Sequence, residues 1–287
     1  MKTISVAHSP DADDIFMYYA IKFGWVTPND ANFTNIADDI ETLNKATLNG
    51  EYDICAISFA LYPFVKDDYA LLRTAVSFGE GYGPKLIKKK GTRLKKNFKV
   101  ALSGEFTTNG LLFKIAYPNA RITYMNFLEI EQAVIDGTVD AGVLIHESIL
   151  DFSDDLEVEK ELWDIWVELS GGDLPLPLGG MCIRRSIPLH SAIDYENTLI
   201  KAVDVANKNR KVLAPMLLDK GLIRVDADTL DTYLDLYAND NSVELSDIQY
   251  KALDKLFELG YKNGFYENLI KSQDFLIPSE YKELRAK

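Results

Sequence analysis

The chain has 287 residues, of which 47% are hydrophobic and 26% charged, a composition typical of a globular protein with a substantial core. Its length allows two domains or one large one. The formal net charge of −13 at pH 7 argues against a nucleic-acid partner, because phosphate binding requires a basic face. A small anionic ligand is not excluded, since it responds to the local field and not to the total charge.

The cysteines and the N-terminus indicate a reduced protein that stays inside the cell. Cys55 and Cys182 lie far apart in apolar runs without metal-site spacing, so we expect two core thiols and no metal. The residues after Met1 enter a strand directly and lack the apolar segment of a signal peptide. No run approaches the ~18 apolar residues of a membrane span. We therefore expect a cytoplasmic protein without a membrane partner.

The first part of the chain alternates strand and helix patterns. Strands are expected over residues 4–7, 32–37 and 52–58, and helices over 15–23, 40–48 and 59–65. This order implies parallel strands with right-handed crossovers. The Ser9-Pro10 pair and the aspartates after it have the chemistry of a helix cap. The same helix N–H groups could instead help to hold an anion.

A second α/β unit follows a basic stretch. Residues 69–76 read as a strand and 79–84 as a flexible turn, and the basic residues between Lys85 and Lys99 read as a solvated connection between domains. Further strands are expected at 99–102, 121–125, 141–145 and 181–184, and helices at 110–116, 130–135, 199–206, 212–218, 230–236 and 248–259. The last four helices show no concentrated chemistry and should complete the first domain. We expect a first lobe of residues 1–95 and 186–287 and a second lobe of residues 96–185.

One strand end carries the clearest chemical signal. Residues 141–145 have the length and composition of a strand buried on both faces, and they end at His146-Glu147, where a loop should begin. Ligands of open parallel sheets bind beyond the carboxyl ends of the strands, so His146 should face a cleft and titrate near neutral pH. The alternative is a structural histidine. The chain has only three histidines, and the other two, His8 and His190, also lie close to expected strand ends.

Two α/β lobes whose strand ends meet at one cleft describe the periplasmic-binding-protein type II fold. Four segments narrow the class further: Ser9-Pro10 with Asp14 and Phe16, the pair Thr107-Thr108, Asp140 through Glu147, and Leu174 through Gly180. In that order they resemble the 1,4-dihydroxy-6-naphthoate synthases of the futalosine route to menaquinone. The resemblance covers about residues 4–185.

This resemblance implies a lyase that converts cyclic dehypoxanthine futalosine to 1,4-dihydroxy-6-naphthoate and releases dihydroxyacetone, with no metal or redox cofactor. The residue that matches the family's general base is His146, and such a base typically contributes ~10²–10⁴-fold to a proton transfer. By residue matching, the substrate would be bound by Ser9, Ala56, Ile57, Ser58, Thr107 and Thr108. For the two threonines, capping a helix is as good an explanation as binding the substrate, and the two roles are compatible. The implied partner is a small-molecule carboxylate, and a homodimer is left open.

The sequence departs from the family pattern at two places. Asp11-Ala12-Asp13 stands where Cys-Pro-Asn is expected. The lysine that the family has just before the serine of the third strand is missing in Ala56-Ile57-Ser58. The missing lysine leaves open which basic residue meets the substrate carboxylate, with Lys85 and Arg184 as candidates. Each of the two departures could also alter which substrate is bound. Two other functions also stay open. One is a solute-binding protein that closes on an anionic or aromatic ligand without chemistry, and the other is the sister enzyme chorismate dehydratase.

Overall fold

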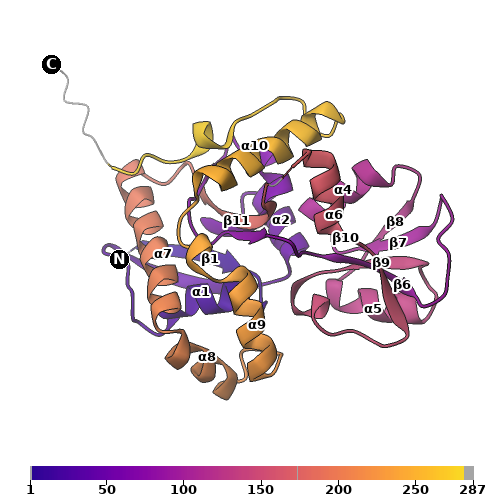
Figure 1. Ribbon diagram of the computed structural model, residues 1–287. Coiled ribbons are helices and arrows are strands. Elements are labelled where there is room, and N and C mark those ends of the chain that lie inside the picture. Colours follow the sequence, from indigo (N-terminus) through magenta and orange to yellow (C-terminus); the bar gives the residue numbers. More distant parts are fainter. Residues whose placement is uncertain (1, 173, 281–287) are drawn as a thin grey trace.

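The computed structural model describes residues 2–172 and 174–280. Two β-sheets, each covered by helices, form two lobes that lie side by side, with the first lobe on the left of Figure 1 and the second on the right. Continuous chain segments cross between the lobes near the middle of this view. The two-lobed α/β architecture expected from the sequence is therefore the one observed.

The first sheet has the spatial order β2-β1-β3-β11-β4, and β5 also pairs with β11. Its strands are β1 (Lys2–His8), β2 (Ala31–Ala37), β3 (Ile54–Ser58), β4 (Tyr69–Leu71), β5 (Ser77–Gly79) and β11 (Leu176–Arg184). Strand β1 is parallel to β2 and β3, as the strand–helix alternation predicts. Strand β11 runs antiparallel to its neighbours. The strand expected over residues 69–76 ends early, at Leu71.

Helices surround this sheet and continue to the C-terminal end of the described chain. They are α1 (Ala12–Lys22), α2 (Ile40–Leu48), η1 (Phe59–Leu61), α3 (Tyr62–Val65), α7 (Leu189–Lys208), α8 (Arg210–Asp219), α9 (Ala227–Tyr237), η3 (Asp240–Ser242), α10 (Asp247–Lys262) and η4 (Ser272–Phe275). Helix α2 has the bounds that the sequence predicts, because the Asp39 carboxylate accepts hydrogen bonds from the first helical N–H groups. Helix α1 packs against α7 and α9, and α10 packs against both β11 and α6.

The second sheet has the order β10-β6-β9-β7-β8. Its strands are β6 (Lys85–Lys89), β7 (Lys99–Leu102), β8 (Arg121–Tyr124), β9 (Ala141–Leu144) and β10 (Leu156–Glu161), and its helices are α4 (Thr108–Ala116), α5 (Phe127–Ile135), η2 (His146–Ile149) and α6 (Leu162–Ser170). Strand β7 is parallel to β8 and β9, whereas β6 is antiparallel to β9 and to β10. The sequence patterns did not predict β10 or α6.

The basic stretch is not a solvated connection along its whole length. Residues 85–89 form β6, in which Leu86 and Ile87 are buried and the ammonium group of Lys88 lies 2.6 Å from the Glu159 carboxylate of β10. Sheet membership also differs from the expected lobe boundaries. Strand β6 falls in the range assigned to the first lobe but pairs in the second sheet, and β11 falls in the range assigned to the second lobe but pairs in the first. Each lobe thus receives one antiparallel strand from the chain that crosses over.

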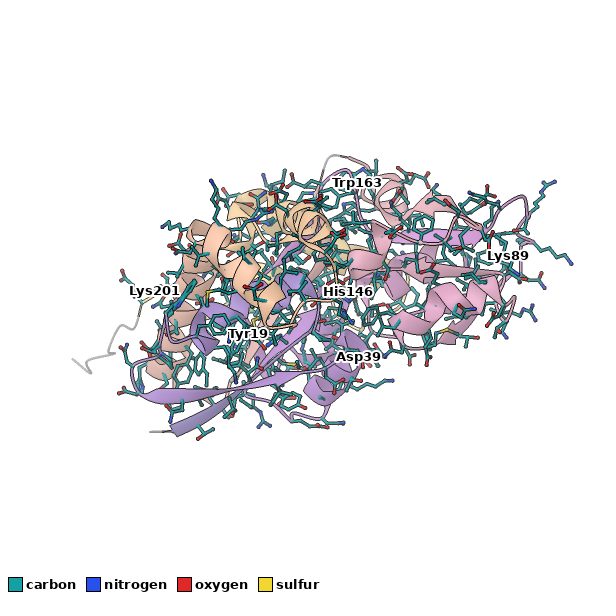
Figure 2. All side chains as sticks on the ribbon, turned by 90° about the horizontal axis from the view of Figure 1, so that it is seen from below. Tyr19, Asp39, Lys89, His146, Trp163 and Lys201 are labelled. Atoms are coloured by element: carbon teal, nitrogen blue, oxygen red, sulfur yellow. The ribbon has the colours of Figure 1, made fainter. Side chains whose placement is uncertain are left out.

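This arrangement brings His146 to the junction of the lobes. Figure 2 shows His146 between them, with Lys89 near the far end of the second lobe and Lys201 on the opposite side of the first. Cys55 and Cys182 are opposite one another on β3 and β11, and both are buried free thiols, as expected. Within residues 2–172 and 174–280, no helix combines the length and apolar character needed to cross a membrane.

Candidate active site

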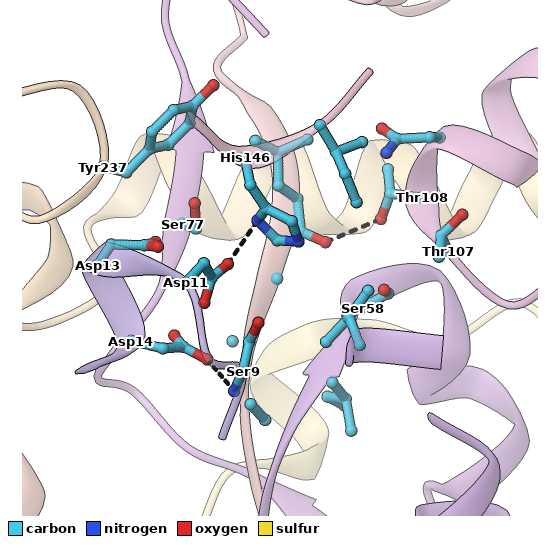
Figure 3. Close-up of a pocket in the computed structure, with 18 of the residues that line it drawn as sticks. Ser9, Asp11, Asp13, Asp14, Ser58, Ser77, Thr107, Thr108, His146 and Tyr237 are labelled. Carbon is cyan, nitrogen blue, oxygen red and sulfur yellow. Dashed lines mark hydrogen bonds and ion pairs between the residues drawn. The ribbon is translucent and has the colours of Figure 1, made fainter. Parts of the chain in front are cut away.

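A pocket at the lobe junction is lined by strand ends and helix starts from both lobes. It encloses about 710 Å³ of empty space, counting the part open to solvent. All of the residues expected to form the site line this one pocket, namely His146, Ser9, Ala56, Ile57, Ser58, Thr107 and Thr108 (Figure 3). The segments that carry them are up to 137 residues apart in the chain, so the two lobes together create the pocket.

His146 begins η2, directly after the end of strand β9, and it has a positive φ of 55°. Histidine is one of the residues that tolerate this conformation, and such backbone outliers cluster at functional sites. The ring nitrogen Nδ1 contacts the carboxylate of Asp11, and the ring edge packs against Phe127 with centroids 4.9 Å apart. The other nitrogen, Nε2, is buried and has no hydrogen-bond partner among residues 2–172 and 174–280. One nitrogen is therefore held while the other is available.

The contact between His146 and Asp11 changes the pKa of both groups. Burial by itself would lower the pKa of His146, but the negative charge and hydrogen bond of Asp11 outweigh it and raise that pKa above its ordinary value. Burial would likewise raise the pKa of Asp11, and the positive charge of His146 reverses this and lowers it. The pair is thus stabilised in its charged form, and above the raised pKa the neutral ring keeps its proton on Nδ1 and leaves Nε2 as a proton acceptor.

Two further aspartates lie beside this pair. Burial and the nearby charge of Asp11 raise the pKa of Asp13 strongly and raise the pKa of Asp14 to about 8. The Asp14 carboxyl also accepts a hydrogen bond from the backbone N–H of Ser9 at 2.8 Å. The shift favours the neutral acid form of both groups, and at neutral pH the Asp14 carboxyl is largely protonated and can donate a hydrogen bond to a ligand.

The same three carboxyls could in principle hold a cation. One oxygen from each of Asp11, Asp13 and Asp14 can be chosen so that all lie within 4.8 Å of one another. Asp11, however, already pairs with His146, and Asp14 with Ser9. The raised pKa values of Asp13 and Asp14 also disfavour the ionised form that a metal ligand requires. We derive no chemical step through a metal at this position.

Ser58 is positioned by a residue that sequence reasoning missed. Asn44 on α2 is fully buried, and its side-chain amide donates to the Ser58 hydroxyl at 3.1 Å. The Asn44 carbonyl oxygen accepts from the backbone N–H of Ser58 at 2.9 Å. This double contact fixes the last residue of β3 at the pocket wall. In the sequence, Asn44 is only one polar residue within an amphipathic helix, so no local signal marks it.

Thr107 caps helix α4, whereas Thr108 bonds to strand β11 of the first lobe. The Thr107 hydroxyl accepts from the backbone N–H of Gly110 at 3.0 Å and donates to the carbonyl of Gly104 at 3.1 Å. The Thr108 hydroxyl donates to the carbonyl of Leu178 at 3.0 Å. Both hydroxyl protons are therefore already engaged. Any hydrogen bonds that this segment donates to a ligand would come from the first-turn N–H groups of α4, which have no partner within the helix.

Helix α9 supplies pocket residues that we did not predict, because the last four helices of the chain were expected to carry no chemistry. Tyr233 and Tyr237 line the pocket, and burial raises the pKa of both phenols. Their spacing of four residues is that of any buried helix face, so the sequence alone cannot separate them from core residues. Their positions depend on how α9 packs.

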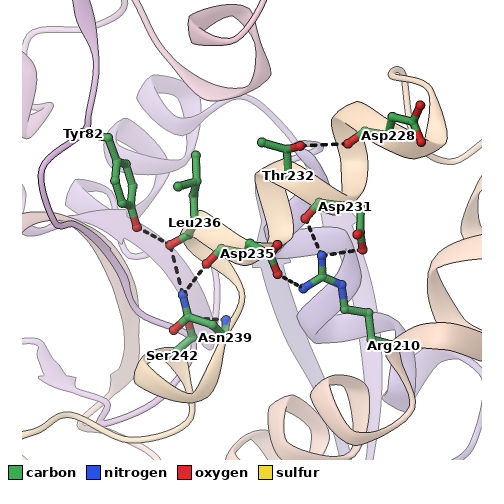
Figure 4. Close-up of polar contacts among 9 residues, drawn as sticks. All are labelled: Tyr82, Arg210, Asp228, Asp231, Thr232, Asp235, Leu236, Asn239 and Ser242. Atoms are coloured by element: carbon green, nitrogen blue, oxygen red, sulfur yellow. Dashed lines mark hydrogen bonds and ion pairs between the residues drawn. The ribbon is translucent and has the colours of Figure 1, made fainter.

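Polar contacts with neighbouring segments hold α9 in place (Figure 4). The guanidinium group of Arg210 on α8 contacts the carboxylates of Asp231 and Asp235, each at 2.6 Å. The Tyr82 hydroxyl donates to the carbonyl of Leu236. These contacts come from both sides of the helix and orient the face that carries the two tyrosines.

Several buried polar atoms around the pocket have no hydrogen-bond partner in the part of the chain that the structure describes. They are Ser9 Oγ, Asp11 Oδ1, Asp13 Oδ1, Ser103 Oγ, Asn109 Oδ1 and His146 Nε2. Buried polar atoms are ordinarily paired, so a group of unpaired atoms on one pocket indicates that a polar ligand completes them.

None of the described residues that line this pocket is a lysine or an arginine. Neither basic candidate reaches it. The Lys85 ammonium donates to the carbonyl of Ile149 at 2.8 Å, and the Arg184 guanidinium lies against Gly50. Neither of these two candidates therefore lines the pocket in this structure.

The other two histidines lie outside this pocket. His8 ends β1, where it is buried and its Nδ1 lies 2.7 Å from the carbonyl of Ser9, and burial lowers its pKa. His190 lies in the first turn of α7. His146 is thus the histidine that faces the cleft.

The fold and site define a two-lobed binding-protein architecture with a buried histidine–carboxylate pair in its cleft. Solved structures support the fold. The ligand-binding component of an ABC-type import system from Staphylococcus aureus superimposes with a TM-score of 0.72 at 13% identity, over 99% of each chain. The periplasmic aliphatic sulphonate binding protein SsuA from Escherichia coli gives 0.64 at 12% identity, over 100% of this chain and 96% of that one. At such identities the likeness shows the type II periplasmic-binding-protein fold alone.

The chain belongs to the menaquinone biosynthesis family, whose model matches residues 4–262. Two relatives named 1,4-dihydroxy-6-naphthoate synthase come from Streptomyces coelicolor, 30% identical over 88% of this chain and 90% of that protein, and from Thermus thermophilus, 28% identical over 90% and 93%. A crystal structure of an Archaeoglobus fulgidus protein is 33% identical, with a TM-score of 0.83 over 91% of this chain and 98% of that one. The family resemblance drawn from the four segments is therefore confirmed, and the match extends beyond residue 185 into the C-terminal helices.

Proposed function

We propose that this protein is a carbon–carbon lyase that converts cyclic dehypoxanthine futalosine to 1,4-dihydroxy-6-naphthoate with release of dihydroxyacetone, in the cytoplasm. The observation that carries the proposal is His146, which lies in a buried pocket between the lobes with Nε2 unpaired. Membership of the menaquinone biosynthesis family and the names of the two relatives support the same reaction.

His146 is the proposed general base. Breaking a carbon–carbon bond next to a latent carbonyl requires removal of a proton from a hydroxyl or carbon of the substrate, and Nε2 is the available acceptor. The proton moves to Nε2, the scissile bond breaks, and its electron pair enters the ring system that becomes aromatic. Aromatisation provides the driving force, and the three-carbon fragment leaves as dihydroxyacetone. A well-placed base of this kind contributes ~10²–10⁴-fold.

The polarity of the pocket suggests an orientation for the substrate. Because no lysine or arginine lines the pocket, we propose that the substrate carboxylate meets the first turn of α4, near Ser58 and Ser103. The partial positive charge of a helix N-terminus contributes ~0.3–1 kcal/mol to such an anion. The hydroxyl-bearing portion would then face Asp13 and Asp14, whose raised pKa values favour the neutral carboxyl that can donate a hydrogen bond.

The other expected contacts fit this orientation. Ala56 and Ile57 offer an apolar strip of β3 for the ring, and the unpaired Ser9 hydroxyl can bind a polar substituent. Thr107 and Thr108 would act through the backbone of α4, since their hydroxyls are engaged. In this proposal the partner is a small-molecule carboxylate, and a homodimer is compatible with it.

Product analysis tests the proposal. The purified protein, without added cofactors, is incubated with cyclic dehypoxanthine futalosine and, in parallel, with chorismate, and both reactions are followed by mass spectrometry. Formation of 1,4-dihydroxy-6-naphthoate together with dihydroxyacetone is the expected result. Consumption of chorismate would instead identify the sister dehydratase. Thermal stabilisation by the cyclic substrate without any product would indicate a binding protein.

A further inference from the structure

We infer that Asp11 is the positioning residue of His146, holding the imidazole from across the lobe junction so that Nε2 is the nitrogen presented to the substrate. Asp11 precedes α1 in the first lobe, and His146 follows β9 in the second. The inference deepens the proposed function and rests on it as far as catalysis is concerned. The contact between the two side chains can be tested without any substrate.

Asp11 is not used for the role that its place in the sequence predicts. It occupies the N-cap position of α1, where an aspartate normally accepts a hydrogen bond from the helix N–H groups. Its side chain makes no such bond, and only 4% of the residue is exposed. The carboxylate instead contacts His146 Nδ1. A buried carboxylate that leaves its helix uncapped to meet a histidine in the other lobe favours a functional explanation.

The contact determines which ring nitrogen is free. A carboxylate only accepts hydrogen bonds, so Nδ1 must carry a proton, and in neutral imidazole the lone pair then lies on Nε2. Nε2 is the nitrogen for which the described residues offer no partner. The edge of the ring against Phe127 limits its rotation. Together these contacts fix both the tautomer and the direction of the base.

The other charged groups around His146 have different partners. The adjacent Glu147 carboxylate accepts from the backbone N–H of Ala12 at 2.9 Å and lies 3.7 Å from the guanidinium group of Arg224. Asp14 accepts from the N–H of Ser9. The guanidinium group of Arg224 also lies over the ring of Phe127, which packs against His146. The guanidinium carbon is 5.3 Å from the centroid of that ring. Asp11 is therefore the carboxylate that contacts the imidazole directly.

The first test is NMR of the three histidines in the wild type and in Asp11→Asn, with Asp30→Asn as an exposed control. Signals of His146 are assigned from their loss in His146→Gln. The expected result is an Nδ1–H tautomer in the wild type and a titration of His146 that moves to lower pH in Asp11→Asn but not in the control. An Nε2–H tautomer in the wild type, or a titration unchanged in Asp11→Asn, would overturn the inference. The wild-type tautomer decides the question even if the variant does not fold.

The second test is the pH dependence of turnover. Asp11→Asn should lower kcat by ~10²-fold, the lower end of what a general base contributes, with KM changed little. The acid limb of kcat/KM should also move to lower pH, because a base without its carboxylate loses its proton more easily. A residue needed only for folding would lower activity without moving that limb, and this result would contradict the inference. Absence of turnover in the wild type would remove the proposed function but not the NMR result.

Discussion

Glu147 and Ala12 are joined across the lobe junction, where the Glu147 carboxylate accepts the backbone N–H of Ala12 at 2.9 Å. Ala12 is the first residue of α1, and Glu147 is the neighbour of the proposed base. The carboxylate therefore occupies the helix start that Asp11 leaves uncapped. Glu147 does not orient His146 directly; it docks the segment that carries His146 onto the first lobe.

Replacing Glu147 separates the effects of its hydrogen bond and its charge. Glu147→Ala leaves the buried N–H of Ala12 without an acceptor, which should lower the free energy of unfolding by ~1–3 kcal/mol. Glu147→Gln keeps an acceptor and loses mainly the charge facing the partly exposed Arg224, so it should cost less. Urea unfolding of both variants measures the difference. Equal losses would show that the charge, and not the hydrogen bond, dominates.

A second contact between the lobes predicts an effect on substrate affinity. Glu41 of α2 accepts from the backbone N–H groups of Glu105 at 3.0 Å and Phe106 at 3.3 Å, and it packs against Gly104. A Cβ atom at position 104 would lie 2.2 Å from a Glu41 carboxylate oxygen and 2.8 Å from Glu41 Cβ. Gly104→Ala should therefore displace Glu41 and weaken this contact between the lobes. If closure weakens by ~1.4 kcal/mol, KM rises about tenfold.

The matched control is Gly172→Ala, because a Cβ atom there meets nothing within 4 Å. Steady-state kinetics of both variants measure the change in KM. A KM for Gly104→Ala equal to that of the control would show that this contact does not govern substrate affinity.

Asp14 predicts a stability that depends on pH. Its pKa in the folded protein is raised from 3.8 to about 8, so the folded state holds the proton more tightly than the unfolded chain does. The contribution of Asp14 to the free energy of unfolding is greatest below pH 3.8, and it falls as the pH rises toward 8. Asp14→Asn removes the titration and keeps an acceptor for the N–H of Ser9.

Asp14→Asn should therefore be more stable than the wild type by ~0.5–2 kcal/mol at neutral pH, the range typical of relieving a strained functional site. The difference should shrink as the pH falls toward 4. Thermal unfolding across this pH range provides the measurement. A difference that stays constant with pH would contradict the raised pKa of Asp14.

Much of the fold follows from local pattern. The bounds of α2 were predictable because Asp39 caps its start and Asn49-Gly50 ends it, and β9 was predictable because its apolar run stops at His146. Strand β6 was not, because three of its five residues are lysines and its burial comes from pairing with β9 and β10. Its character is set by neighbours that are distant in the sequence.

The site divides in the same way. The positions of Ser58 and His146 at the pocket follow from the rule that parallel strands end at a cleft. The sequence did not place Tyr237 and Asp11 at the pocket. Tyr237 has the pattern of a helix core residue, and Asp11 has that of a helix cap. Both acquire their place only when α9 and the second lobe pack against α1.

His146 is the residue that we propose as the base of the lyase reaction. The most direct measurement compares the wild type with His146→Ala on cyclic dehypoxanthine futalosine, following 1,4-dihydroxy-6-naphthoate by mass and substrate binding by thermal shift. We expect product from the wild type, a rate at least ~10²-fold lower in His146→Ala, and binding retained in both. Turnover in His146→Ala equal to that of the wild type would contradict this proposal.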